Sequence, residues 1–230
     1  MEKIILSFEN VTGKKCGFIL KDISFELKAG YICGLIGKNG AGKTTLMNYI
    51  LKENSKYDGI IRIDGEDIQE NHAQILNKVG FVSEDNHFFE NCTCGQNVES
   101  LSVFYDDFDR NKFRDIMDSM NLSDGKIYKK MSRGEQLKFQ LAFAIAHSPR
   151  IYLLDEVTAG MDPVFRIEFF KILQRIIMDE SASVLMTSHI SSEIEKKTDF
   201  IGVMENGVLV DFGESPDIIP NLKGGVGYES

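Results

Sequence analysis

The sequence predicts an α/β fold built around a mostly parallel sheet. Apolar runs at residues 31–36 and 151–154 are short, bounded by turns or polar residues, and typical of buried parallel strands. Strand-like segments alternate with helical ones on both sides of the middle of the chain, which indicates β-α-β connections. Residues 86–147 have helical periodicity instead, so we expect an inserted α-helical subdomain.

The N-terminal segment predicts antiparallel strands. Apolar and polar residues alternate over residues 4–8 and again over 23–27, the pattern of strands with one buried face. A further strand at residues 60–63 lies between two Asp-Gly turns. We therefore expect an N-terminal antiparallel β subdomain within residues 1–85.

A glycine-rich loop predicts a phosphate-binding site. Its sequence, GKNGAGKT, fits G-x-x-x-x-G-K-[ST] at every fixed position, and it lies between a predicted strand and a helix predicted over residues 44–51. The glycines allow several backbone N–H groups to face one anion, and the helix adds its positive end, as in a P-loop NTPase. Lys43 is expected to reach the β- and γ-phosphates, and Thr44 to offer its hydroxyl to Mg²⁺. The residues expected to bind nucleotide here are Gly37, Lys38, Asn39, Gly40, Ala41, Gly42, Lys43, Thr44 and Thr45.

Two acidic residues follow the apolar run at 151–154. Ligands of open parallel sheets bind beyond the carboxyl ends of the strands, so Asp155 is placed to orient Mg²⁺ through a water. Glu156 is placed to polarise the attacking water as general base; capping of the next helix is the alternative for both acids. His189 follows a strand predicted over 183–186 and is expected to hydrogen-bond the γ-phosphate, with an ordinary core or surface histidine as its alternative. The catalytic candidates are therefore Glu156, His189 and Lys43.

Helices and a hairpin complete the predicted order. Residues 113–120 carry one apolar helix face, with acidic residues before it at the positive end of the helix dipole. A second helix is predicted over residues 135–147 and a third over 165–176. Asn206-Gly207, between alternating apolar residues, predicts a hairpin that adds antiparallel strands at the sheet edge.

These motifs, in this order, resemble the nucleotide-binding subunit of ABC (ATP-binding cassette) transporters over residues 5–213. Residues 131–136, Met-Ser-Arg-Gly-Glu-Gln, are similar to the family signature, usually Leu-Ser-Gly-Gly-Gln. The resemblance implies that Ser132 and Gly134 contact the γ-phosphate bound by the opposite subunit; an ordinary Ser N-cap is the alternative, and both can hold together. It also implies that residues 159–162 cross the dimer interface and that His189 is the switch histidine.

Several residues depart from the family pattern. Glu84 stands where the family usually has a Gln, so a carboxylate is expected to meet Mg²⁺ or water while adding negative charge beside ATP. Arg133 and Glu135 stand where Gly and Gln are common in the signature. No aromatic residue near residues 14–16 is available to stack on adenine; Phe18 is the nearest candidate, and a core strand position is the favoured alternative for it. The residues expected to hold Mg²⁺, partly through water, are Thr44, Glu84 and Asp155.

Length and charge limit the function. The 230 residues carry a net charge of −9, which excludes bulk electrostatic binding to nucleic acid. No apolar run approaches the ~20 residues that span a bilayer, and the N-terminus has no signal-peptide core. Four cysteines without a framework spacing fit a cytoplasmic chain and are interpreted as small buried residues rather than as a zinc site. We expect one cassette over residues 1–230. Its parts are an ATPase core with the β subdomain at 1–85 and 148–215, a helical subdomain at 86–147, and a C-terminal tail at 216–230.

The resemblance implies a transport ATPase. Together with a second copy or a related cassette, the chain would bind ATP and Mg²⁺ at a head-to-tail interface. It would drive a separate integral membrane permease from the inner face of the cell membrane, docking it near Glu84 and the helical subdomain. The similarity is greatest to single-cassette subunits of bacterial drug or peptide exporters, so export is expected. A soluble ABC-type ATPase in an assembly or regulatory complex is the alternative, followed by a nucleotide-binding module with little turnover.

Overall fold

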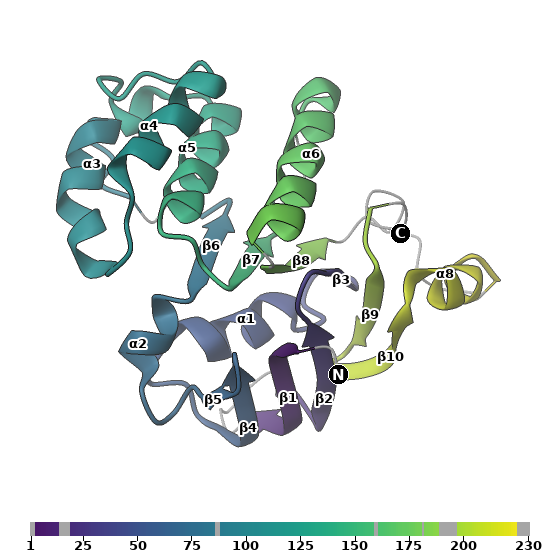
Figure 1. Ribbon diagram of the computed structural model, residues 1–230. Coiled ribbons are helices and arrows are strands. Elements are labelled where there is room, and N and C mark those ends of the chain that lie inside the picture. Colours follow the sequence, from purple (N-terminus) through teal and green to yellow (C-terminus); the bar gives the residue numbers. More distant parts are fainter. Residues whose placement is uncertain are drawn as a thin grey trace.

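The structure is a computed structural model of the chain, in which sheets and a separate group of helices occupy different regions (Figure 1). It describes residues 3–13, 19–85, 88–158, 161–180, 182–188 and 197–224. Among these residues, no helix combines the length and the apolar character that crossing a bilayer requires.

The N-terminal part forms the antiparallel sheet that the sequence predicts, although residues 5–8 are all buried instead of alternating between a buried and an exposed face. Its strands, in spatial order, are β2 (Ile23–Lys28), β1 (Ile4–Gly13), β4 (Tyr57–Ile63) and β5 (Glu66–Asp67). In β2 the apolar residues Ile23, Phe25 and Leu27 are buried and alternate with exposed ones, so one face of the strand packs on the core. Helix α2 (His72–Leu76) follows this sheet and leads to the next strand.

The second sheet is mostly parallel, which confirms the α/β fold class. Its strands, in spatial order, are β10 (Val208–Glu214), β9 (Phe200–Glu205), β3 (Ile32–Ile36), β8 (Ser183–Ser188), β7 (Ile151–Asp155) and β6 (Val79–Ser83). Every neighbouring pair from β9 to β6 is parallel, so the carboxyl ends of these strands share one edge of the sheet.

The hairpin at Asn206-Gly207 is confirmed, with one correction. Both turn residues have positive φ, 47° and 84°, as a type I′ turn requires. The prediction that the hairpin adds antiparallel strands is wrong for β9, which pairs parallel with β3; only β10 runs antiparallel. The reason is that a tight turn sets the direction of two strands relative to each other and not relative to the rest of the sheet.

The core sheet is buried on both faces, as the continuous apolar runs predict. In β3, Ile32 and Ile36 belong to a cluster that includes helix α6 (Pro163–Glu180). Cys33 and Leu35 face the other way, into a cluster that includes helix α1 (Lys43–Leu51) and the antiparallel sheet. The two helices therefore cover opposite faces of the sheet.

Helices make up the middle of the chain, at the upper left of Figure 1. They are α3 (Cys94–Leu101), α4 (Arg110–Ser119) and α5 (Arg133–Ala146). Asp109 is the N-cap of α4 and accepts hydrogen bonds from the N–H groups of Asn111 and Lys112, at 2.8 and 3.0 Å. These bonds lower the pKa of the Asp109 carboxyl, as expected for an acid at a helix start.

A last helix, α8 (Ser215–Gly224), follows β10. It occupies the beginning of the segment that we expected to be a C-terminal tail. Ile218 of α8 is buried and belongs to the cluster on the α6 face of the core sheet. This part of the tail is therefore packed on the domain.

Candidate nucleotide-binding and hydrolytic site

The phosphate loop connects the carboxyl end of β3 to the start of α1. Gly40 and Gly42 have φ of 82° and 112°, a conformation that glycine adopts without a Cβ penalty. Gly37 approaches β9 so closely that a Cβ would lie 2.3 Å from the carbonyl oxygen of Met204. Gly42 is the N-cap of α1, and within the described residues no side chain caps this helix start. The first N–H groups of α1 are thus directed into the loop, the arrangement that binds phosphate.

Lys43 lies inside the curve of this loop. Its side chain is only 3% exposed, and its ammonium donates hydrogen bonds to the carbonyls of Gly37 at 2.7 Å and Lys38 at 3.2 Å. The same nitrogen lies 3.5 Å from a carboxylate oxygen of Glu156. The structure therefore brings together two of the residues that the sequence predicts to be catalytic.

A threonine hydroxyl joins the two predicted acids. The N–H of Glu156 donates to Oγ1 of Thr187 at 2.9 Å, and that hydroxyl donates to Oδ1 of Asp155 at 2.6 Å. Glu156 has a φ of 52°, a left-handed conformation that costs about 1–2 kcal/mol for a non-glycine residue. The bond from Thr187 therefore stabilises the backbone conformation that aims the Glu156 side chain. No motif singled out Thr187; the available signal was a polar residue ending a buried strand.

A cavity of about 400 Å³ beside the phosphate loop has a mainly apolar wall with several oxygen-bearing side chains at one part of it. Thr44, Ser83 and Asp155 line it, as does Asp85, which the sequence did not single out. Ser83 and Asp155 are register partners on β6 and β7, so the two strand ends meet here. A hydroxyl and a carboxylate are hard oxygen ligands that fit Mg²⁺, an ion usually held in nucleotide sites by one or two protein ligands plus phosphates. Among the described residues, no group of three or more His, Cys, Asp or Glu side chains is placed to hold a metal ion by itself.

Glu84 does not line this cavity with Thr44 and Asp155. Its carboxylate instead forms an ion pair with the guanidinium of Arg133, at the start of α5. The role of Glu84 as a magnesium ligand stays a prediction. The partner of Glu84 is a residue that we noted only as a departure from the signature.

The predicted signature segment begins helix α5. Ser132 is the N-cap and forms a capping box: its Oγ accepts from the N–H of Glu135, whose carboxylate accepts from the N–H of Ser132. Lys126 donates to both oxygens of the Glu135 carboxylate at 2.8 Å, the main cause that lowers the pKa of Glu135. The N-cap interpretation of Ser132 is confirmed. A Cβ on Gly134 would meet nothing within 4 Å in the part of the chain that the structure describes.

Some predicted residues lie outside the described residues. They are His189, Phe18, and residues 159 and 160 of the predicted interface loop. Asp162 of that loop is described, and its Oδ1 accepts from the N–H groups of Val164 and Phe165 at the start of α6. Among the described cysteines, Cys33 and Cys94 are buried as expected, whereas the expectation is wrong for Cys92, which is only half-buried. Burial raises the pKa of Cys33 to about 12 and that of Cys94 to about 11.

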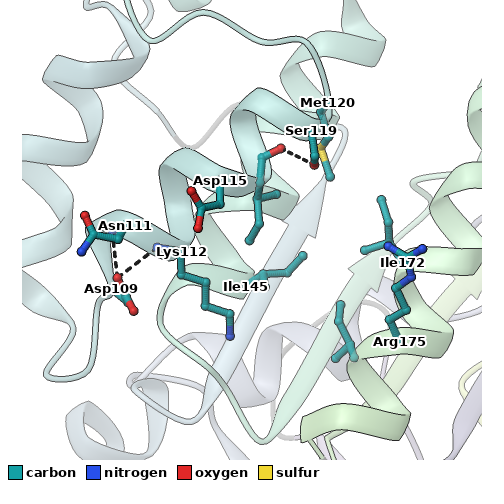
Figure 2. Close-up of a pocket in the computed structure, with 11 residues that line it drawn as sticks. Asp109, Asn111, Lys112, Asp115, Ser119, Met120, Ile145, Ile172 and Arg175 are labelled. Atoms are coloured by element: carbon teal, nitrogen blue, oxygen red, sulfur yellow. Dashed lines mark hydrogen bonds between the residues drawn. The ribbon is translucent and has the colours of Figure 1, made fainter.

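A second cavity, of about 470 Å³, lies between α4 and α6 (Figure 2). Its wall is apolar at Ile145 and Ile172, and charged side chains such as Asp115 and Arg175 stand around it. It contains no residue of the phosphate loop, β6 or β7. This cavity is therefore separate from the residues that the sequence predicts to bind nucleotide.

Comparison with known proteins supports the resemblance to ABC transporters. The family model described as "ABC transporter" matches residues 20–159. The chain is 31% identical over 211 residues to the bacitracin transport ATP-binding protein BcrA of Enterococcus faecalis, covering 90% of this chain and 68% of BcrA. It is 31% identical over 193 residues to the ABC transporter ATP-binding protein YtrB of Bacillus subtilis, covering 84% of this chain and 66% of YtrB. The chain thus spans about two thirds of the length of these relatives.

Solved structures share the fold. An ATP-binding subunit of an ABC transporter superposes with a TM-score of 0.85 at 21% identity, covering 95% of this chain and 93% of that one. Clostridium perfringens cbiO1, part of the ABC transporter complex cbiONQ, has a TM-score of 0.81 at 22% identity, covering 97% and 93%.

Proposed function

The chain belongs to the ABC transporter family, and we propose that it is the ATP-hydrolysing subunit that drives a separate membrane permease, working in export. The family assignment makes it an ATP-binding cassette with ATPase activity. The observation that most directly supports hydrolysis by this chain is the 3.5 Å contact between Lys43 of the phosphate loop and Glu156 at the end of β7.

Each side chain at the phosphate loop has a distinct part in this proposal. Lys43 and the N–H groups at the start of α1 bind the phosphates, and Thr44 and Asp155 hold Mg²⁺. When bound, Mg²⁺ neutralises charge on the β- and γ-phosphate oxygens. Glu156 orients and polarises the attacking water, because its carboxylate already lies beside the ammonium that marks the phosphate position. His189 is proposed to contact the γ-phosphate, on its resemblance to the switch histidine.

A second cassette completes the site. Ser132 and Gly134 are proposed to contact the γ-phosphate bound by the opposite subunit, which is either a second copy of this chain or a related one. The open space at Gly134 supports this, since nothing among the described residues needs a glycine there. The start of α5 also offers N–H groups without intrahelical acceptors, which suit an anion.

The permease is proposed to dock on the helical subdomain. Phe89, Val103 and Phe104 are 52%, 70% and 72% exposed there, although phenylalanine and valine are usually buried. Beside them, Phe88, Tyr105 and Phe143 line a smaller cavity of about 220 Å³. The name of cbiO1, which describes it as part of a transporter complex, supports a multi-subunit assembly of this kind. In such an assembly the chain lies on the inner face of the cell membrane.

Replacement of Glu156 by Gln tests the hydrolytic assignment. The amide keeps the size of the side chain but cannot accept a proton, so hydrolysis should fall by about 10²- to 10⁴-fold while ATP binding persists. Phosphate release and nucleotide binding are measured on the same preparation, with Lys43→Ala as the control that loses binding. The Gln variant should also accumulate as an ATP-bound dimer in size-exclusion chromatography. Hydrolysis at the wild-type rate would show that Glu156 is not the base.

The transport assignment is tested in native membranes. A permease that co-purifies with the tagged chain supports it, whereas a purely soluble partner favours an assembly or regulatory ATPase. Inside-out vesicles that hold both subunits then test direction. ATP-dependent accumulation of a peptide probe such as bacitracin indicates export, since the cytoplasmic face is outward. ATP-dependent loss of preloaded probe contradicts export.

A further inference from the structure

The ion pair between Glu84 and Arg133 joins two functional segments of one chain. Glu84 follows the last residue of β6, next to the cavity that Thr44 and Asp155 line. Arg133 is the first residue of α5 and lies between Ser132 and Gly134, the residues proposed to contact the partner's nucleotide. The pair therefore connects the chain's own nucleotide site to the segment that it presents to the opposite site.

Hydrogen bonds of Gln140 attach the residue before Glu84 to helix α5. Gln140 accepts a hydrogen bond from the N–H of Ser83 at 3.1 Å and donates to the hydroxyl of Tyr128 at 3.2 Å. Gln140 is seven residues after Arg133 (140 − 133), close to two helical turns, so both lie on the same side of α5. The end of β6 is thus attached to α5 at two points, one buried and one near the surface.

The ion pair between Glu84 and Arg133 contributes little to the stability of the fold. The side chains of Glu84 and Arg133 are 33% and 53% exposed, and exposed ion pairs contribute little to folding. Their position matters more, because Glu84 lies between Ser83 and Asp85, which line the cavity beside the phosphate loop, and a free carboxylate there would repel the phosphates of ATP. The guanidinium neutralises that charge and turns the carboxylate toward α5.

We propose that Arg133 is a positioning residue for Glu84, holding the carboxylate at the start of α5 and competing for it with the metal that accompanies the nucleotide. The inference rests on the proposed function of the phosphate loop. It explains how this cassette accommodates an acid where the family usually has an amide. It also gives Arg133 a function within its own subunit, apart from the contacts proposed for Ser132 and Gly134.

The proposal predicts that replacing Arg133 by Ala weakens the binding of ATP without metal and strengthens the binding of Mg²⁺ to the nucleotide site. A released carboxylate repels ATP, so ATP affinity in EDTA should fall, by about two- to fivefold given the exposure of the pair. The same carboxylate attracts Mg²⁺, so the Mg²⁺ concentration that restores half-maximal nucleotide binding should also fall. A damaged helix start would weaken binding both with and without metal, and hence would not give this combination.

The experiment uses equilibrium binding of ATP by the full chain, first in EDTA and then along a Mg²⁺ titration. Arg133→Ala is compared with Arg133→Lys, which keeps the charge and should therefore stay close to wild type in both quantities. Arg114→Ala is the matched control, since it removes one exposed arginine from α4 in the same subdomain and should change neither quantity. Thermal melting of each variant checks that the fold is retained.

A Glu84→Gln background decides whether Arg133 acts through Glu84. Adding Arg133→Ala to Glu84→Gln should have no effect on the Mg²⁺ requirement, because no carboxylate remains to be released. The inference is overturned if Arg133→Ala changes the Mg²⁺ requirement equally in both backgrounds. It is also overturned if the single variant binds ATP more weakly both without metal and with it. Wild-type chain that binds ATP no better than Lys43→Ala overturns the proposed function, and this inference with it.

Discussion

The phosphate loop and the start of α5 are both expected to meet a γ-phosphate, yet they are built differently. Lys43 is almost fully buried and held by two carbonyls and a carboxylate, whereas Arg133 is about half exposed and held by one carboxylate. Behind Lys43, Asp155 and Glu156 are fixed by the buried hydroxyl of Thr187. Ser132 is held by the capping box with Glu135, and a Cβ on Gly134 would meet open space among the described residues. The first region is a preorganised half-site, and we propose that the second becomes a site only when another subunit binds.

Of three further substitutions, Thr187→Val, which breaks the buried half-site, is expected to have the largest effect. The substitution leaves the N–H of Glu156 and Oδ1 of Asp155 without their partner, which should lower the free energy of unfolding by about 1–3 kcal/mol. Misdirection of Glu156 should lower kcat by about 10- to 100-fold, with a smaller change in ATP affinity. Thr187→Ser keeps the hydroxyl and serves as the control. If the Val variant turns over as fast as the Ser variant, the hydroxyl does not position Glu156.

An intermediate effect, on the exposed half-site alone, is expected from Gly134→Ala. Nothing among the described residues obstructs the new methyl group, and Ala favours a helix over Gly by up to about 1 kcal/mol, so the isolated chain should melt at the same or a higher temperature. ATPase activity should nevertheless fall by about tenfold or more, because the methyl group would enter the interface with the second subunit. Urea unfolding and ATPase assays on one preparation check both. An activity equal to wild type would separate Gly134 from the interface.

The smallest effect is expected from Glu135→Gln, which tests the charge interaction between Glu135 and Lys126 at the start of α5. Gln can still accept the N–H of Ser132, so only the charge interaction with Lys126 is lost, worth a few tenths of a kcal/mol at this exposed site. Because the pKa of Glu135 is lowered on folding, its contribution is present above the unfolded pKa and disappears as pH falls through the folded one. The stability difference between wild type and variant should therefore vanish in acid. A difference that persists at low pH would assign it to something other than this carboxylate.

Local motifs made much of this site predictable, and long-range pairing explains the rest. The phosphate loop could be located because eight consecutive residues contain all the groups of its motif. Asp155 and Glu156 could be located because they end an apolar run. Thr187 and Arg133 could not, since each acts on residues far away in the sequence, and only strand register and helix packing bring them within reach. The parallel direction of β9 was missed for the same reason.

The sequence by itself determined the fold class, the nucleotide loop and the family, because periodicity, turn residues and contiguous motifs are local properties of the chain. Only the tertiary structure decided that a threonine hydroxyl fixes the two acids, that Lys43 faces Glu156, and that Glu84 is turned to Arg133. Hydrogen bonds and ion pairs act over about 3–4 Å, so they depend on which strand ends and helix starts the completed fold places side by side.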